Sequence, residues 1–320
     1  MTQIIAELCQ NHNGDLDLLR QMVRHAATAG ADYVKIQSML SSDLTRRERF
    51  ENGFEEDGVV KVIKRPYQAE YDRLKPLDLD DDAHYMFIEE CKKYDVKPLT
   101  TVFNRTRIPF LASLPWPEKA IKVASFDCRS KPLIKDLINA GFKKFFISTG
   151  TTYDQEIKET AELLKSAGVD YTLLHCVSIY PTPLEAGHLE RIDYLKQFTD
   201  SVGFSEHSSY EQNKLKLSIA ALTYDVDVIE RHFTVLPKEQ TRDGVVSLNK
   251  EQLAELAFYC KASSEDFFHR AMKILKPSEY SIMKGHQTRA LTPTEILNRD
   301  YYQGRFANHI GGKVMYNWEE

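Results

Sequence analysis

The stretch IIAELCQNHNGDLDLLRQMVRHAATAGADYVKIQS, residues 4–38, holds one copy of the pattern that decides the fold. A short apolar run, Ile4–Leu8, precedes an amphipathic run, Leu16–Ala29, and then Gly30 and a second apolar run, Tyr33–Ser38. Near-continuous apolar runs are typical of parallel strands, which are buried on both faces. Glycine just past a helix end is the usual C-cap residue. The stretch therefore predicts a β–α–β unit with parallel strands.

The same alternation continues to about residue 276. Further strands are predicted at Pro98–Phe103, Ala120–Ser125, Lys144–Ser148, Thr172–Val177, Ser201–Ser205 and Asp227–His232, and further helices at Asp81–Lys93, Pro132–Ala140, Gln155–Ala167, Gln212–Tyr224 and Gln252–Tyr259. Eight strand–helix units predict an α/β fold of the (β/α)8 TIM-barrel type. A doubly wound open sheet is the alternative, but no G-x-G-x-x-G motif follows any of these strands.

The predicted barrel covers residues 1–276, and residues 277–320 form a short C-terminal extension. One long irregular insertion, Leu40–Asp80, follows the second strand and is rich in charge. It is predicted to be a solvated surface excursion, with a lid over the barrel mouth as the alternative, because loops at this end of a barrel often carry function.

Composition narrows the classes of function. The 320 residues are 42% hydrophobic and 28% charged, which is typical of a soluble globular protein. No apolar window approaches the ~18 residues that a membrane span needs, and the N-terminus lacks a signal-peptide pattern, so a cytoplasmic protein without a membrane partner is expected. The net charge of −5 and the dispersed basic residues argue against nucleic acid as a partner. Five scattered cysteines without a C-x-x-C pair predict reduced thiols.

Polar residues gather where the predicted strands end, which is where TIM barrels carry their active sites. His207 and His232 end neighbouring strands, so both imidazoles can face one mouth, and imidazole suits Mn, Fe, Zn or Co. Lys35 and Lys122 lie on strands, where lysine is costly to bury unless it is paired. The two lysines predict an anionic ligand; the alternative is that each pairs with a carboxylate such as Glu7 or Glu230.

Six segments carry a family resemblance. They are Ile-Ile-Ala-Glu…Asn-His-Asn-Gly-Asp (4–15), Val-Lys-Ile-Gln (34–37), Ser-Thr-Gly (148–150), Leu-Leu-His-Cys…Tyr-Pro-Thr-Pro (173–183), Gly-Phe-Ser-Glu-His (203–207) and Ile-Glu-Arg-His-Phe-Thr (229–234). In this order they resemble the sialic acid synthase (N-acetylneuraminate synthase) family over roughly residues 3–250. No single segment is decisive, but six in register make coincidence very improbable.

The resemblance implies a transferase that condenses phosphoenolpyruvate with an aldehyde sugar, an N-acetylmannosamine-like hexose, to give a nonulosonic 2-keto-3-deoxy acid and phosphate. His207 and His232 would hold a divalent metal, Mn2+ first, with Mg2+ or Co2+ possible, and Glu7 would be the acid or base. The implied phosphoenolpyruvate ligands are Lys35, Thr101, Lys122, Ser125, Ser148, Ser178 and Ser205, and the implied sugar ligands are Gln37, Phe103, Tyr180 and Asp243.

Three departures from the family accompany the resemblance. Asp127, counted here as catalytic, replaces the usual Glu, and Ser178 replaces the usual Asn. Residues 277–320 do not resemble the antifreeze-protein-like domain that commonly follows the barrel. The segment Arg299–Phe306, basic and aromatic, is the candidate substitute: an arm that helps enclose the site of a homodimer, in cis or in trans, with packing on its own barrel as the alternative.

Two rival functions are retained. One is a Schiff-base aldolase on the same barrel, with Lys122 or Lys35 as nucleophile, which would not need the histidine pair. The other is a non-catalytic sugar-acid-binding homologue, suggested by the missing domain and by Asp127.

Overall fold

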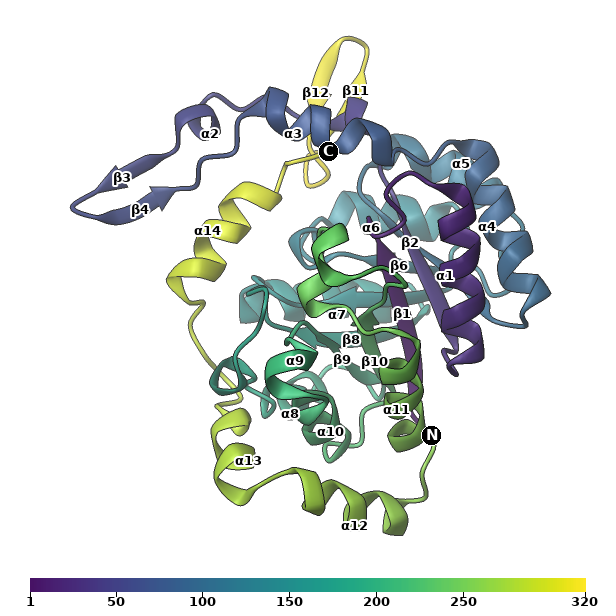
Figure 1. The fold of residues 1–320 in the computed structure, drawn as a ribbon. Coiled ribbons are helices and arrows are strands. Elements are labelled where there is room, and N and C mark those ends of the chain that lie inside the picture. Colours follow the sequence, from purple (N-terminus) through teal and green to yellow (C-terminus); the bar gives the residue numbers. More distant parts are fainter.

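A computed structural model describes the backbone of residues 1–320 and all side chains except those of Ser264, Glu265, Phe268 and Met272. Its centre is a closed barrel of eight parallel strands (Figure 1). Around the barrel their order is β1 (Gln3–Cys9), β2 (Tyr33–Ser38), β5 (Lys97–Val102), β6 (Ala120–Val123), β7 (Lys144–Ser148), β8 (Asp170–Cys176), β9 (Val202–Glu206) and β10 (Val228–His232). The predicted TIM barrel is confirmed, and the open sheet is excluded because β1 pairs with both β2 and β10.

Helices cover the outside of the barrel and supply the larger hydrophobic core. They include α1 (Leu16–Thr28), α4 (Asp81–Lys93), α5 (Ile108–Ser113), α6 (Lys131–Asn139), α7 (Asp154–Ser166), α8 (Arg191–Leu195) and α11 (Lys250–Cys260). The start of α1 is fixed by Asp15, whose carboxylate accepts hydrogen bonds from the first-turn amides. One helix boundary was predicted wrongly. The expected helix Gln212–Tyr224 is two helices, α9 (Tyr210–Asn213) and α10 (Lys216–Leu222), because Lys214 adopts a positive φ of 52°.

The insertion after β2 is more ordered than the sequence predicted. It contains α2 (Arg49–Asn52), a hairpin of β3 (Phe54–Glu56) and β4 (Val59–Val62), and α3 (Tyr67–Leu74). The hairpin projects away from the barrel while α3 lies over its upper end (Figure 1). The expectation that the insertion is irregular is therefore wrong, whereas its exposed hairpin does form a surface excursion.

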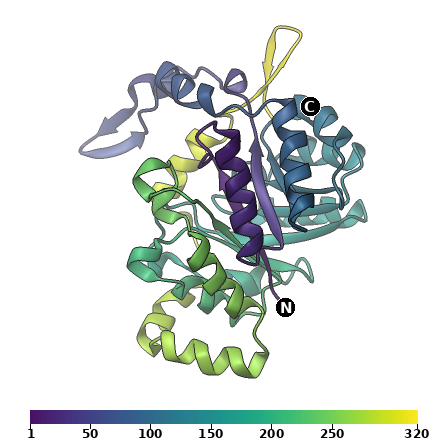
Figure 2. The same ribbon diagram turned by 45° about the vertical axis from the view of Figure 1, so that its right-hand side comes forward.

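The C-terminal segment climbs along the barrel wall, from α12 (Ser264–Ile274) beside the N-terminus to the opposite end (Figures 1 and 2). It continues through α13 (Pro277–Lys284) and α14 (Pro293–Tyr302) to a hairpin of β11 (Asn308–Ile310) and β12 (Lys313–Met315). Residues 285–320 are called the C-terminal arm below. Leu44 and Phe306 form an isolated bridge that joins the arm to the insertion after β2.

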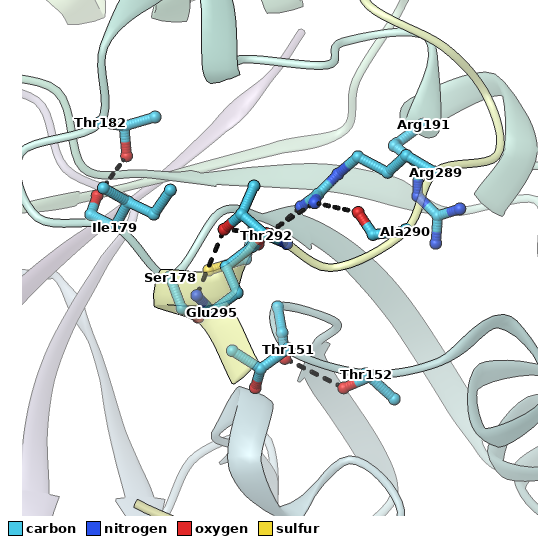
Figure 3. Close-up of polar contacts among 12 residues, drawn as sticks. Thr151, Thr152, Ser178, Ile179, Thr182, Arg191, Arg289, Ala290, Thr292 and Glu295 are labelled. Atoms are coloured by element: carbon cyan, nitrogen blue, oxygen red, sulfur yellow. Dashed lines mark hydrogen bonds and ion pairs between the residues drawn. The ribbon is translucent and has the colours of Figure 1, made fainter. Parts of the chain in front are cut away.

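Buried polar contacts hold the start of α14 together and dock the arm onto the loops after β7 and β8. Figure 3 shows the contacts within the arm, with Thr151 and Ser178 of the two loops nearby. Arg289 donates two hydrogen bonds of 2.6 Å to the fully buried carboxylate of Glu295, which also accepts from Thr292 at the start of α14. From α14, Asn298 donates to the carbonyl of Ser178 at 2.8 Å, and Arg299 to the carbonyl of Thr151 at 2.6 Å. These contacts fix α14 beside the barrel mouth.

No helix among the described residues is long and apolar enough to cross a membrane.

A second buried ion pair braces the two strands that carry the predicted metal ligands. Glu206 and Arg231 are register partners on β9 and β10, and their side chains, fully buried, form a short ion pair. Arg231 also donates to the carbonyl of Ser208 at 3.1 Å, while burial lowers its pKa to about 9. Because His207 and His232 directly follow these two residues, the pair sets how the two strand ends lie against each other.

We expect Glu206→Gln to lower the free energy of unfolding by about 3–5 kcal/mol, because it leaves a guanidinium buried without its counter-charge. Chemical denaturation followed by circular dichroism measures this. Asp17→Asn removes the exposed pair with Arg20 and should cost less than about 1 kcal/mol. Equal losses in the two variants would show that the buried pair has no special weight.

Candidate functional site

A cavity of about 470 Å³ opens at the carboxyl ends of the strands. It is lined by fourteen of the predicted site residues: Glu7, Lys35, Gln37, Thr101, Phe103, Lys122, Ser125, Asp127, Ser148, Tyr180, Ser205, His207, His232 and Asp243. The remaining one, Ser178, is buried behind the lining, and its hydroxyl has no hydrogen-bond partner among the described residues. An added Cβ at Gly150 would lie 2.6 Å from that hydroxyl, so Gly150 closely covers Ser178.

The floor of the cavity holds two lysines and two glutamates. The ammonium of Lys35 contacts Glu7 directly, lies 3.8 Å from Glu230, and donates to Thr101 at 2.8 Å. The ammonium of Lys122 donates to Ser148 at 2.6 Å and lies 4.0 Å from Glu230. The pairing that the sequence left open as an alternative is therefore present. As ionised groups the four compensate one another, so an anion that binds here needs further positive charge.

Burial shifts the protonation of this floor. It lowers the pKa of Lys35 to about 7, with Glu230 opposing the shift and Lys122 adding to it. The pKa of Glu230 is lowered, since the lysines and the hydroxyl of Ser205 outweigh its burial. The direct contact with Glu7 also favours the charged ammonium and opposes the lowering of the Lys35 pKa by burial.

The two predicted metal ligands stand together on the cavity wall. The ring centres of His207 and His232 lie 5.1 Å apart, and Tyr180 packs edge-on against His207 at 4.1 Å. Burial lowers the pKa of both imidazoles and the neighbouring lysines lower it further, although Asp243 opposes the shift at His232; both rings are therefore neutral at pH 7. Neutral imidazole is the form that binds metal.

The histidine pair fits a cation. Nδ1 of His232 is buried without a hydrogen-bond partner among the described residues. Two imidazoles on one ion place their ring centres about 5 Å apart when each metal–nitrogen bond is ~2.1 Å, close to the observed separation. Asp243 and Cys9 are the carboxylate and thiol donors that lie near His232, and nothing in the sequence indicated that Cys9 would lie here.

Asp127 lies at the side of the cavity that the C-terminal arm covers. Its carboxylate accepts hydrogen bonds from Ser130 at 2.9 Å and from Asn317 at 3.0 Å. Burial raises its pKa to about 6, while these two hydrogen bonds and Arg129 act in the opposite direction. Asn317 belongs to the arm, so the arm directly contacts a predicted catalytic residue.

The rim of the cavity is basic and comes from separate parts of the chain. Arg65 and Arg73 belong to the insertion after β2, Arg242 to the loop after β10, and Arg305 to the arm. Glu70 contacts both Arg73 and Arg305. Although burial opposes the shift, these arginines lower the pKa of Glu70 to about 2. Arg305 lies in the segment that the sequence predicted as an arm, whereas Arg65, Arg73 and Arg242 were not predicted as site residues.

Aromatic residues join the arm to the predicted sugar ligands. Phe306 packs against Phe103 with ring centres 5.6 Å apart, and Tyr302 stacks on Phe126 at 4.7 Å. Tyr302, Arg305 and Phe306 all line the cavity. Arg299 does not: it pairs with Glu156 on α7. Within this chain, the later part of the segment Arg299–Phe306, from Tyr302 onward, faces the site, and Arg299 at its beginning anchors the helix.

A closed (β/α)8 barrel with ionisable and hydroxyl groups gathered at its strand ends defines a TIM-barrel protein of the enzyme type. Residues 22–266 match the NeuB family, and the chain belongs to that family. It is 32% identical over 267 residues to N,N'-diacetyllegionaminic acid synthase of Campylobacter jejuni, covering 80% of this chain and 74% of that protein. It is 29% identical over 264 residues to N-acetylneuraminate-9-phosphate synthase of Drosophila melanogaster, covering 79% and 65%.

A solved structure agrees with this assignment. The N-acetylneuraminic acid (sialic acid) synthetase of Leptospira borgpetersenii, in complex with citrate, superimposes with a TM-score of 0.67 at 26% identity. The alignment covers 94% of this chain and 90% of that chain. The resemblance stated from six short segments is thereby confirmed, as is the barrel fold.

The raised pKa of Asp127 predicts a pH dependence of stability. The folded-state pKa, about 6, exceeds the ordinary value of 3.8, so the folded protein holds a proton that the unfolded chain has released between these two pH values. Stability should therefore fall as the pH rises from 4 to 6, by about 3 kcal/mol in total from this group, and change no further above it.

Asp127→Asn removes this titration. Relative to the unmodified protein, the variant should gain stability between pH 4 and pH 6, as measured by urea denaturation at each pH. Asp136→Asn, at a partly exposed carboxylate on α6 that pairs with Arg105, is the matched control. Parallel pH profiles for Asp127→Asn and the unmodified protein would contradict the assignment.

Proposed function

We propose that this protein condenses phosphoenolpyruvate with an aldehyde sugar, a hexose of the N-acetylmannosamine type, to form a sialic-acid-like 2-keto-3-deoxy acid and phosphate. The observation that carries the proposal is the adjacency of the lysine and hydroxyl groups on the cavity floor to two neutral histidines on its wall. Membership of a family whose relatives bear the names of legionaminic and N-acetylneuraminate-9-phosphate synthases supports it.

Charge balance supports a divalent cation as part of the site. Phosphoenolpyruvate carries a phosphate and a carboxylate, whereas the four ionised floor residues compensate one another. The rim arginines supply part of the missing positive charge, and a cation on the cavity wall would supply the rest. His207 and His232 are neutral and add no charge. His207 and His232 would hold the ion, Mn2+ by the family resemblance, and when bound it would supply Lewis-acid polarisation of the sugar aldehyde.

The residues of the chain divide the remaining work. Lys35, Lys122 and the hydroxyls of Thr101, Ser125, Ser148 and Ser205 bind the phosphate and carboxylate, through charge-assisted hydrogen bonds worth about 1.5–3 kcal/mol each. Carbon 3 of phosphoenolpyruvate attacks the aldehyde carbon, water adds at carbon 2, and the resulting tetrahedral intermediate expels phosphate. Glu7, in contact with Lys35, is positioned to accept and return the proton of the water or alkoxide. No covalent bond to the enzyme forms.

The arm completes the sugar subsite within the same chain. Gln37, Phe103 and Tyr180 line the same cavity as Tyr302, Arg305 and Phe306. A guanidinium presents a fixed fork of donors that suits the hydroxyl and carbonyl groups of a sugar. We propose that Arg305 takes the role that the antifreeze-protein-like domain has in the family. The homodimer and the cytoplasmic location expected from the sequence belong to the same proposal; sedimentation equilibrium tests the dimer.

The experiment that tests the function is phosphate release from phosphoenolpyruvate in the presence of each of a panel of six-carbon aldoses and N-acetylated aldoses. At least one acceptor should give sugar-dependent release. Lys122→Ala should raise the KM for phosphoenolpyruvate about tenfold or more, the loss expected from one charge-assisted hydrogen bond, and leave the KM for the sugar nearly unchanged. A change confined to the sugar KM would place Lys122 at the other substrate.

If no sugar supports phosphate release, the two alternative functions remain to be tested. Borohydride with pyruvate would add a stable mass to a Schiff-base aldolase, at Lys35 or Lys122, but none to the proposed enzyme. Lys35 has the lowered pKa that such a nucleophile needs, which is the observation in favour of that rival. Sugar-acid binding without turnover would identify the non-catalytic homologue.

The role of the arm has its own test. Arg305→Gln removes the charge and leaves a shorter, polar side chain, and it should raise the KM for the sugar about tenfold with little change in the KM for phosphoenolpyruvate. Arg299→Gln, at an arginine that pairs with Glu156 outside the cavity lining, is the matched control. Equal sugar constants for Arg305→Gln and the unmodified enzyme would reduce the arm to a packing element.

A further inference from the structure

Three potential metal ligands from separate parts of the chain lie close together beside the cavity. They are the thiol of Cys9 at the end of β1, the imidazole of His232 at the end of β10, and the carboxylate of Asp243 in the loop that follows. Their donor atoms all lie within 4.8 Å of one another. Cys9 Sγ is 2.9 Å and His232 Nδ1 3.8 Å from the same oxygen, Asp243 Oδ2.

One of these donors is buried and unpartnered. His232 is 8% exposed, and its Nδ1 has no hydrogen-bond partner among the described residues, although it faces Asp243. Leaving a buried ring nitrogen unpaired costs about 1–3 kcal/mol, so an uncompensated group of this kind calls for a ligand. The other ligand atoms within reach are those of Asp243 and Cys9.

The backbone holds Cys9 in this position. The pairing of β1 with β2 shifts register between Glu7 and Cys9, and Cys9 has a φ of 39°. Its amide donates to the carboxylate of Glu7 at 2.6 Å. Irregularities of this kind are over-represented next to active sites, where they direct a side chain toward the site. Cys9 is thus a residue placed at the site by an unusual conformation and is not a passive core thiol.

We propose that Cys9 and Asp243 join His232 as direct ligands of the divalent cation, so that the centre has a mixed sulfur, nitrogen and oxygen donor set. With metal–sulfur and metal–nitrogen bonds of about 2.3 and 2.1 Å, neighbouring donor atoms on a tetrahedral ion lie roughly 3.4–3.6 Å apart. The observed separations of 2.9 and 3.8 Å bracket this range. His207 lies outside this group of donors, with its ring centre 5.1 Å from that of His232, so the three protein ligands leave a coordination position open for the sugar aldehyde.

This donor set changes the expected metal. Thiolate is a soft ligand that favours Zn2+, Co2+ and Fe2+, whereas Mn2+ and Mg2+ favour oxygen donors. The site would therefore prefer a thiophilic ion to the Mn2+ expected from the family. Asp243 would then hold the ion and would not be free to contact a sugar hydroxyl. The inference rests on the proposed function for the presence of an ion, but not for the substrates.

The test is spectroscopic. Metal-free protein is titrated with Co2+, whose bond to a thiolate gives an intense near-ultraviolet charge-transfer band that histidine and carboxylate ligands do not give. The unmodified protein should develop the band at one equivalent, and Cys9→Ser, which keeps the size of the side chain, should lack it. Removal of a second-shell partner alone costs about 10–100-fold in metal affinity, so Cys9→Ser and Asp243→Asn should each weaken Co2+ binding at least about 100-fold.

Controls separate the possible outcomes. Cys91→Ala changes a buried thiol on α4, remote from the site, and should keep the band. Cys176, whose Sγ lies 3.9 Å from His207 Nδ1, is the competing thiol. A band that survives Cys9→Ser but disappears in Cys176→Ser would overturn the assignment of Cys9. Binding of Co2+ to the unmodified protein without the charge-transfer band would also overturn it. If the thiolate band appears but none of the sugars tested supports phosphate release, this inference stands and the proposed function is rejected.

Discussion

Four buried ionisable side chains share the floor of the cavity, and the other features of the site depend on how Glu7, Lys35, Lys122 and Glu230 compensate one another. Buried charges are tolerated only when they are paired and hydrogen-bonded. Here hydroxyls of Thr101, Ser148 and Ser205 supply the remaining hydrogen bonds. The floor is consequently polar, rigid and close to neutral, and an anionic substrate must bring or meet additional positive charge.

The histidines follow from the same burial. Desolvation and the nearby lysines keep His207 and His232 neutral, which removes them as anion ligands and makes them available to a cation. Behind them the Glu206–Arg231 ion pair joins β9 to β10 at the positions just before the two histidines. The site thus has three parts. The Glu206–Arg231 ion pair joins the two strands, the two imidazoles that follow it can bind a cation, and the paired lysines and glutamates form the floor beside them.

The arm and the insertion after β2 supply the part of the cavity lining that lies outside the barrel strands. Both meet over the mouth, through Arg305 with Glu70 and through the Leu44–Phe306 bridge. Asn317 reaches Asp127, a residue one methylene shorter than the glutamate usual in the family. The side-chain amide of Asn317 donates a hydrogen bond to the carboxylate of Asp127, so the arm directly contacts the residue that replaces the usual glutamate.

Much of this could be predicted from the sequence, because each prediction depended on short-range chemistry. Apolar runs of strand length, separated by amphipathic runs that end in glycine, determined the barrel, and the residues that close each strand determined which side chains meet at its mouth. Strand Tyr33–Ser38 and helix Asp81–Lys93 were predicted to the residue. The break at Lys214 was missed, since a positive φ at a lysine has no local signal.

Only the tertiary structure decided which charges compensate one another and which segments cover the mouth. Arg65, Arg73, Arg242 and Arg305 come from three distant parts of the chain, and no spacing rule relates them. The pairing of both lysines with glutamates was one of two possibilities until register brought Glu7 beside Lys35. Cys9 appeared in the sequence as one scattered thiol among five, and it lies against His232 and Asp243 only because a closed barrel brings its first and last strands together. Sequence determines the residues at each strand end, but the closure of the barrel determines their neighbours.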